Sequence, residues 1–142
     1  GDVYKRQGLE VPKYLIGIQK VLVNIMPSFR LSNRININDL TKDNDINFKY
    51  SKDQLVHDRI SFRLYSEINK QIDLVKERAN RIKIKTLLYH GSDDKIISSE
   101  SVDILSLLIN NNQKIIFDKA YHEPHNDLEK NEVFKKIIKF LN

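Results

Sequence analysis

Two carboxylates and one imidazole in this sequence lie where they could support acid–base chemistry. Asp93 and Asp94 follow a short apolar run, 86–89, and His122 follows a second one, 114–117. A carboxylate that accepts a hydrogen bond from a histidine ring fixes the tautomer of the ring, so that the other ring nitrogen can take a proton from a nucleophile. The three side chains can work in this way only if the fold brings the two loops together.

The two apolar runs have the composition of buried strands. Residues 86–89 read Thr-Leu-Leu-Tyr and residues 114–117 read Lys-Ile-Ile-Phe, while apolar residues recur at helical spacing over 98–110. A strand–helix–strand crossover makes the two strands parallel, so their carboxyl ends lie at one edge of a sheet. The spacing therefore predicts that the Asp loop and the His loop meet at that edge. It also predicts four buried strand residues, Leu87, Leu88, Ile115 and Ile116.

The neighbouring polar residues have simpler interpretations. Gly91 is expected to permit a tight turn at the end of the first strand. Asp93 is interpreted as a turn or helix-capping residue, and His90 as a donor to a backbone carbonyl. His57 and His125 are expected at the surface.

A zinc site is a further possibility at His122-Glu123-Pro124-His125, which superficially resembles a zinc-protease helix. The spacing of the two histidines is wrong for that motif, and Pro124 would interrupt the helix that must present both rings on one face. We therefore expect neither a metal nor a cofactor.

The residues around both loops resemble the C-terminal part of an α/β-hydrolase. The segments His90-Gly91-Ser92-Asp93-Asp94 and Ala120-Tyr121-His122-Glu123 are similar to those of the monoacylglycerol lipase and lysophospholipase-like branch, often labelled serine aminopeptidase-like. In that family the triad Asp lies in a His-Gly-x-x-Asp pattern, which implies Asp94 rather than Asp93. The triad His follows the last strand in a Tyr-His pattern, which implies His122, and the family order is Ser, Asp, His. The resemblance is good from about residue 85 to residue 142 and vague before that.

The resemblance implies an α/β fold class in three parts. Residues 1–7 would be an unrelated or disordered leader, 8–80 a helical cap or lid, and 81–142 the C-terminal part of the α/β-hydrolase core, with the last two parallel strands, their crossover and the C-terminal helices. Helical spacing over 11–25 and 61–79 agrees with a cap. The polar segment 28–50, expected to be a loop with one short helix near Leu40, suits an inserted lid. The alternative is that these helices belong to a plain core.

A last amphipathic helix is predicted over 133–141. Its apolar residues recur at helical spacing and are expected to form one buried stripe, made of Val133, Phe134, Ile137, Ile138 and Leu141.

The nucleophile of the family is missing from these 142 residues. The family serine lies in Gly-x-Ser-x-Gly, and none of the 4 glycines flanks a serine in that way, while no cysteine can replace it. The resemblance therefore implies a C-terminal part of a serine ester hydrolase for monoacylglycerol- or lysophospholipid-like esters, which supplies Asp94 and His122 and is inactive alone. Two alternatives stay open: a non-catalytic binding module of the same fold, or another hydrolase such as a peptidase or an epoxide hydrolase.

The composition is that of a soluble globular protein of one domain, with 40% hydrophobic and 30% charged residues. The absence of cysteine excludes disulfides and thiolate chemistry, and no apolar run is long enough to span a bilayer. The net charge of +5 is scattered, so nucleic acid is not expected as a partner. We expect a cytoplasmic protein that binds a small lipid-like ester and whose cap touches a membrane surface transiently.

Overall fold

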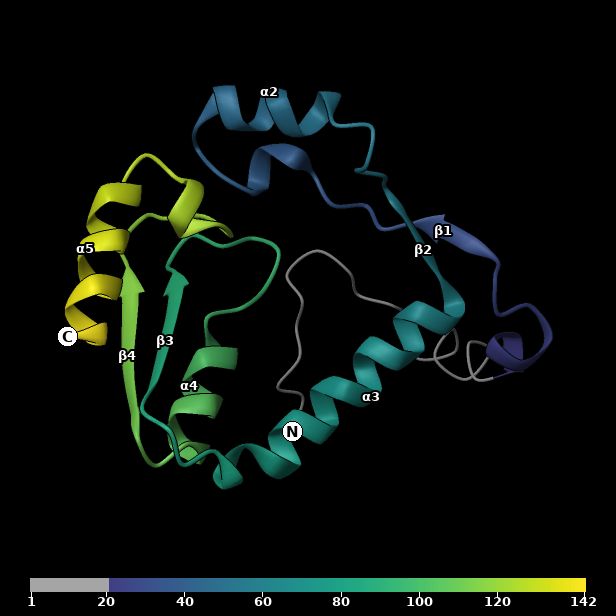
Figure 1. Ribbon diagram of the computed structural model, residues 1–142. Coiled ribbons are helices and arrows are strands. Elements are labelled where there is room, and N and C mark those ends of the chain that lie inside the picture. Colours follow the sequence, from purple (N-terminus) through teal and green to yellow (C-terminus); the bar gives the residue numbers. More distant parts are fainter. Residues whose placement is uncertain (1–20) are drawn as a thin grey trace.

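The computed structural model describes residues 21–142 of the chain, and Figure 1 shows how their helices and strands are arranged. The expected leader at 1–7 and most of the expected first helix lie outside the described residues. Of that helix, residues 21–25 are described and are helical.

The described residues form an α/β protein with one antiparallel and one parallel pair of strands. In chain order the elements are β1 (Arg30–Ser32), the 3₁₀ helix η1 (Ile37–Asp39), α2 (Asn44–Lys52), β2 (Arg59–Ser61), α3 (Phe62–Arg78), η2 (Ala79–Arg81), β3 (Thr86–Gly91), α4 (Glu100–Leu108), β4 (Asn112–Phe117), η3 (Pro124–Asn126) and α5 (Lys130–Leu141).

The predicted strand–helix–strand unit is confirmed. Strands β3 and β4 are parallel, with a register that runs from Thr86 opposite Asn112 to Gly91 opposite Phe117. Helix α4 forms the crossover and packs against both strands. The two strands thus end opposite each other, and the loops that carry the candidate residues leave the same edge of the sheet.

The core lies on one face of this pair of strands. Side chains at alternate positions of a strand share a face, and those of Tyr89, Ile115 and Phe117 pack with Ala120 and with two residues of α5, Val133 and Ile137. Ala120 and Val133 are fully buried. Ala120, near the start of the loop after β4, is therefore part of the core, and its burial holds the start of that loop against the sheet.

The predicted burial of the strands is wrong in part. Leu87, Leu88 and Ile115 are only half-buried, and Ile116 is 40% exposed. The reason is that, within residues 21–142, no third strand pairs with β3 or β4. Both outer edges of the pair therefore lack a neighbouring strand among residues 21–142.

The predicted stripe of the last helix is also only partly buried. Val133 is completely buried and Ile137 half-buried, whereas Phe134, Ile138 and Leu141 are 48%, 57% and 74% exposed. The spacing correctly shows an amphipathic helix, but the described part of the chain covers only one side of its apolar face.

The segment before α3 is more regular than predicted. Residues 28–50 were expected to be a loop with one short helix near Leu40, and η1 lies next to that position. These residues also contain β1, which pairs antiparallel with β2, and most of α2. Helix α2 begins where the Asp43 carboxylate accepts hydrogen bonds from the backbone N–H groups of Asp45 and Ile46, which is N-capping. Phe29 and Phe62 stack at a centroid distance of 5.6 Å, joining the two ends of the segment.

Helix α3 agrees with the predicted helix over 61–79. Ser61 caps it by accepting a hydrogen bond from the backbone N–H of Leu64. No residue of α3 is buried, and Leu64 and Val75 are about half exposed. The division of the chain into leader, cap and core remains a prediction. No helix of residues 21–142 combines the length and the apolar character that crossing a membrane requires.

Candidate active site

The loop after β3 buries Asp94 and leaves Asp93 exposed. The Asp94 side chain is 1% exposed, and its Oδ1 accepts hydrogen bonds from the backbone N–H groups of Ile96 at 2.7 Å and Ile97 at 3.0 Å. Asp93 lies on the outside of the turn, where its carboxylate accepts a hydrogen bond from the hydroxyl of Ser92. The turn therefore uses one oxygen of Asp94 to fix its own shape and leaves the other oxygen, Oδ2, for a partner.

The loop after β4 is held against this turn by backbone contacts. The N–H groups of Ser92 and Asp93 donate to the carbonyl oxygens of Phe117 and Ala120 at 2.9 and 3.0 Å. Gly91 is buried, and its φ is not positive. A Cβ at this position would overlap the carbonyl groups of Ala120 and Tyr121. Close approach of the two loops, rather than the expected tight turn, is therefore what requires glycine here.

His122 and Asp94 meet where the two loops converge. Nδ1 of His122 lies 2.8 Å from Oδ2 of Asp94, which is a hydrogen-bond distance. The His122 side chain is 29% exposed, and no hydroxyl or other polar group of residues 21–142 hydrogen-bonds its Nε2. The predicted approach of the two side chains is confirmed, and the second ring nitrogen of this partly exposed side chain has no hydrogen bond among residues 21–142. Their catalytic roles remain a prediction.

His90 is a second imidazole at the same carboxylate, a contact that sequence reasoning missed. Its Nδ1 lies 2.8 Å from the carbonyl oxygen of Gly91, so Nδ1 is the donor, as predicted. Its Nε2 lies 3.2 Å from Oδ2 of Asp94. Two rings thus flank one oxygen, and the only sequence signal for this is the spacing of His90 and Asp94 around Gly91.

The hydrogen bond shifts the pKa values of both partners toward the charged pair. The hydrogen bond that His122 donates to Asp94 raises the pKa of His122 above its ordinary 6.5, and this outweighs the opposing effect of burial. Burial alone would raise the pKa of Asp94. The hydrogen bonds from His122 and from the backbone of Ile97 and Ile96 outweigh burial and hold that pKa below its ordinary 3.8. A carboxylate that stays ionised and a histidine with a raised pKa are what the orienting half of a triad requires.

The other histidines do not join this pair. His57 is exposed, as predicted. His125 is half-buried rather than at the surface, because its ring packs edge-on against Tyr89, with Nδ1 3.5 Å from the tyrosine hydroxyl. Pro124 opens the short 3₁₀ helix η3, and no cluster of metal-ligating side chains is present in the described part of the chain.

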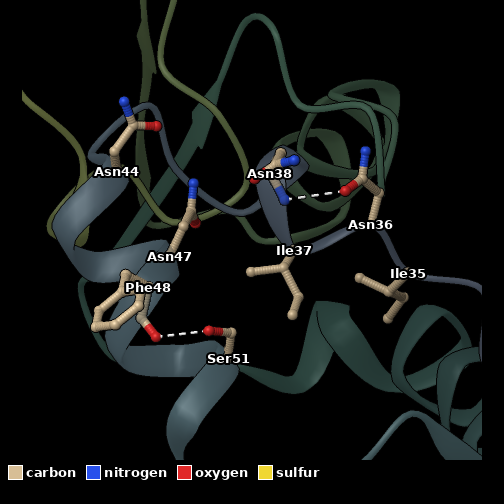
Figure 2. Close-up of a pocket in the computed structure, with 8 residues that line it drawn as sticks. All are labelled: Ile35, Asn36, Ile37, Asn38, Asn44, Asn47, Phe48 and Ser51. Carbon is tan, nitrogen blue, oxygen red and sulfur yellow. Dashed lines mark hydrogen bonds between the residues drawn. The ribbon is translucent and has the colours of Figure 1, made fainter.

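A separate hollow lies in the segment expected to be the cap (Figure 2). The buried amide of Asn47 donates to the carbonyl oxygen of Thr41, while its Oδ1 has no partner among residues 21–142. None of the lining residues belongs to the loops that carry Asp94 and His122, so the hollow is distinct from the pair. It is lined by Ile35, Asn36, Ile37, Asn38, Asn44, Asn47, Phe48 and Ser51.

The sequence of this chain matches the model of the family described as serine aminopeptidase, S33, over residues 3–129. The match covers most of the chain. The chain belongs to this family of α/β-hydrolases. A curated relative is an uncharacterised abhydrolase domain-containing protein from Dictyostelium discoideum, 26% identical over 140 residues, which are 96% of this chain and 15% of that protein.

Three solved structures of hydrolases have the same fold as this chain. A monoacylglycerol lipase from Paleococcus ferrophilus is 32% identical, with a TM-score of 0.81 over 92% of this chain and 52% of that one. A soluble variant of monoglyceride lipase from Saccharomyces cerevisiae, in complex with a substrate analog, is 18% identical, with a TM-score of 0.68 over 91% of this chain and 48% of that one. A thermostable carboxyl esterase from Bacillus coagulans, in complex with glycerol, is 19% identical, with a TM-score of 0.66 over 96% of this chain and 47% of that one. This chain therefore spans about half the length of these structures.

Proposed function

We propose that this chain is the C-terminal part of a serine ester hydrolase, in which Asp94 and His122 are two members of a catalytic triad. The observation that carries the proposal is the 2.8 Å contact between Asp94 and His122, with the His122 side chain partly exposed and no hydrogen bond to its other ring nitrogen among residues 21–142. The serine belongs to a part of the parent protein outside these 142 residues. The S33 family and the order of the two loops along the chain support this assignment.

The arrangement supports acyl transfer in two steps. His122 Nε2 takes the proton of the serine hydroxyl as the serine oxygen attacks the ester carbonyl, and then gives it to the leaving alcohol as the acyl-enzyme forms. Water attacks the acyl-enzyme in the second step, with the same nitrogen accepting its proton and returning it to the serine. Asp94 keeps Nδ1 protonated and stabilises the imidazolium that forms in each step.

The ester is proposed to be a monoacylglycerol- or lysophospholipid-like lipid. The similar solved structures are a monoacylglycerol lipase, a monoglyceride lipase and a carboxyl esterase. The segment before β3 offers apolar surface that could face an acyl chain or a membrane, because Phe48 and Leu55 are 64% and 90% exposed. A peptidase is the second candidate, since the family model is described as a serine aminopeptidase.

The test compares the parent protein with the isolated 142-residue chain. Both are incubated with a fluorophosphonate, which labels activated serines, and both are assayed on a p-nitrophenyl ester and an aminoacyl p-nitroanilide. We expect the parent to be labelled on a serine outside this chain and to hydrolyse the ester, and the isolated chain to do neither.

Each other result points to one alternative. Preference of the parent for the anilide would favour an aminopeptidase. A parent protein with no labelled serine and no turnover would favour a non-catalytic binding module of the same fold. Labelling of the isolated chain would show that the nucleophile lies within these 142 residues.

A further inference from the structure

Asp127 is a completely buried carboxylate near the candidate active site. Its exposed fraction is 0%, and it forms no ion pair with a side chain of residues 21–142. Burying an unpaired carboxylate costs several kcal/mol unless hydrogen-bond donors replace the water it loses. The fold must therefore supply such donors, and which groups supply them shows what Asp127 holds in place.

Four donors surround Asp127, and they come from both sides of the site. Oδ1 accepts from the backbone N–H of Lys42 at 3.0 Å, the hydroxyl of Thr41 at 3.2 Å and the backbone N–H of Leu128 at 2.8 Å. Oδ2 accepts from the backbone N–H of Tyr121 at 2.9 Å. One oxygen thus binds the segment that precedes α2, and the other binds the residue next to His122.

The residue on the other side of His122 is anchored to the same segment. The backbone N–H of Glu123 donates to the carbonyl oxygen of Leu40 at 2.9 Å. The single hydroxyl hydrogen of Thr41 is shared between Oδ1 of Asp127 and the carbonyl oxygen of Asn126, which lies 3.0 Å from the hydroxyl oxygen. Residues 40–42 lie beside the loop after β4 (Figure 1). The residues on both sides of His122, Tyr121 and Glu123, are therefore each held by a backbone hydrogen bond.

We propose that Asp127 is a positioning residue for the catalytic histidine: it ties the His122 loop to residues 40–42 and so holds the ring at the distance from Asp94 that catalysis needs. This inference rests on the proposed function. Asp127 forms no hydrogen bond with the ring of His122 or His90, and it acts through its hydrogen bond with the backbone N–H of Tyr121. The sheet alone does not fix the loop, since the contacts of Tyr121 and Glu123 are made outside it.

Replacing Asp127 by Asn tests this role selectively. An amide has one acceptor oxygen and one NH₂ donor group. In the less costly orientation the oxygen keeps the three donors around Oδ1, and the NH₂ group then faces the N–H of Tyr121. The hydrogen bond to Tyr121 is lost while the contacts to residues 40–42 remain.

The experiment uses the parent protein with Asp127→Asn and with a control, Asn112→Ala. Asn112 begins β4 and donates to the carbonyl oxygens of Ser106 and Ile109, so its loss weakens the fold far from His122. We expect Asp127→Asn to lower kcat by roughly 10- to 100-fold with KM nearly unchanged, since a misplacement of about 1 Å can cost about 10²-fold. We also expect it to weaken the downfield proton resonance of His122 Nδ1–H. The control should retain both.

Equal losses of kcat in both variants at equal loss of thermal stability, with the His122 resonance unchanged, would overturn the positioning role. Hydrogen exchange in the wild-type parent gives a test that needs no variant. The Tyr121 amide should be protected as strongly as the amides of β4, and rapid exchange there would also overturn the proposal. A parent protein without hydrolase activity would contradict the proposed function, while the resonance and the exchange rate would still report on the loop.

Discussion

Asp94 and His122 lie 28 positions apart in the chain, yet Oδ2 of the carboxylate is 2.8 Å from Nδ1 of the ring. The parallel register of β3 and β4 explains this proximity, because the last residues of the two strands, Gly91 and Phe117, lie opposite each other. The buried glycine then allows the two loops to touch. A contact that depends on strand register, a glycine and two backbone hydrogen bonds should be sensitive to change at each of them.

The pH profile of the parent enzyme should report the raised pKa of His122. General-base catalysis needs the neutral ring, so kcat/KM should rise with pH, with a midpoint above the ordinary 6.5. The charge of Glu123 contributes to the raised pKa. Glu123→Gln should therefore move the midpoint to lower pH, whereas Glu129→Gln should leave it unchanged. A wild-type midpoint below 6.5, or equal shifts in both variants, would contradict this account of the site.

The free energy of unfolding should fall as pH rises, whereas kcat/KM should increase. Since the pKa of His122 is raised in the folded protein, its contribution is complete below 6.5 and is lost as pH rises through the folded pKa. The pKa of Asp94 is lowered, so its contribution is present above 3.8 and is lost only as pH falls through the lower folded value. Urea unfolding should thus give a larger free energy at about pH 5.5 than at about pH 8.5, by an amount that shrinks in Asp94→Asn. If the difference in unfolding free energy between the two pH values is the same in Asp94→Asn as in the wild type, the Asp94–His122 pair is not its source.

Gly91→Ala should be strongly destabilising. The added Cβ would overlap the backbone of Ala120 and Tyr121, which cannot move without displacing His122. Overpacking against backbone costs about 2 kcal/mol or more. Asp118→Asn, a change of an exposed residue in the facing loop, should cost less than about 0.5 kcal/mol. Thermal unfolding of the two variants measures the difference, and an unchanged melting temperature for Gly91→Ala would disprove the close approach of the loops.

The isolated chain should self-associate through the exposed face of α5. Phe134, Ile138 and Leu141 present apolar surface on one side of that helix, and such surfaces promote association. Phe134→Lys with Ile138→Lys should reduce the concentration-dependent mass seen by sedimentation, with helix content kept in circular dichroism. Lys135→Gln, on the same helix, is the control. Association that persists unchanged in the double variant would place the contact elsewhere.

The sequence was sufficient to predict the elements that build the site. The runs at 86–89 and 114–117, with helical spacing between them, predict a parallel pair and hence the meeting of Asp94 with His122. The spacing in α5 likewise predicts an amphipathic helix. The apolar spacing does not show that Phe134 is exposed. Spacing shows only which residues share one face of the helix, whereas burial depends on which neighbouring elements cover that face.

The contacts of Asp127 with distant parts of the chain could not be predicted. Asp127 is one acidic residue in a polar loop, and its four donors come from segments that only the fold brings together. Helix α2 was missed because asparagine-rich segments have low helix propensity, and its N-cap at Asp43 was the one local signal for it.

The central claim is that Asp94, and not Asp93, orients His122 as a general base. Hydrolysis of a p-nitrophenyl ester by the parent protein and by its Asp94→Asn and Asp93→Asn variants tests it most directly. We predict that Asp94→Asn lowers kcat by a factor on the order of 10⁴, as in a serine protease whose triad Asp is replaced by Asn. Asp93→Asn should have little effect, since that carboxylate is exposed and contacts only Ser92 among residues 21–142. Wild-type rates in Asp94→Asn, or a larger loss in Asp93→Asn, would contradict the assignment.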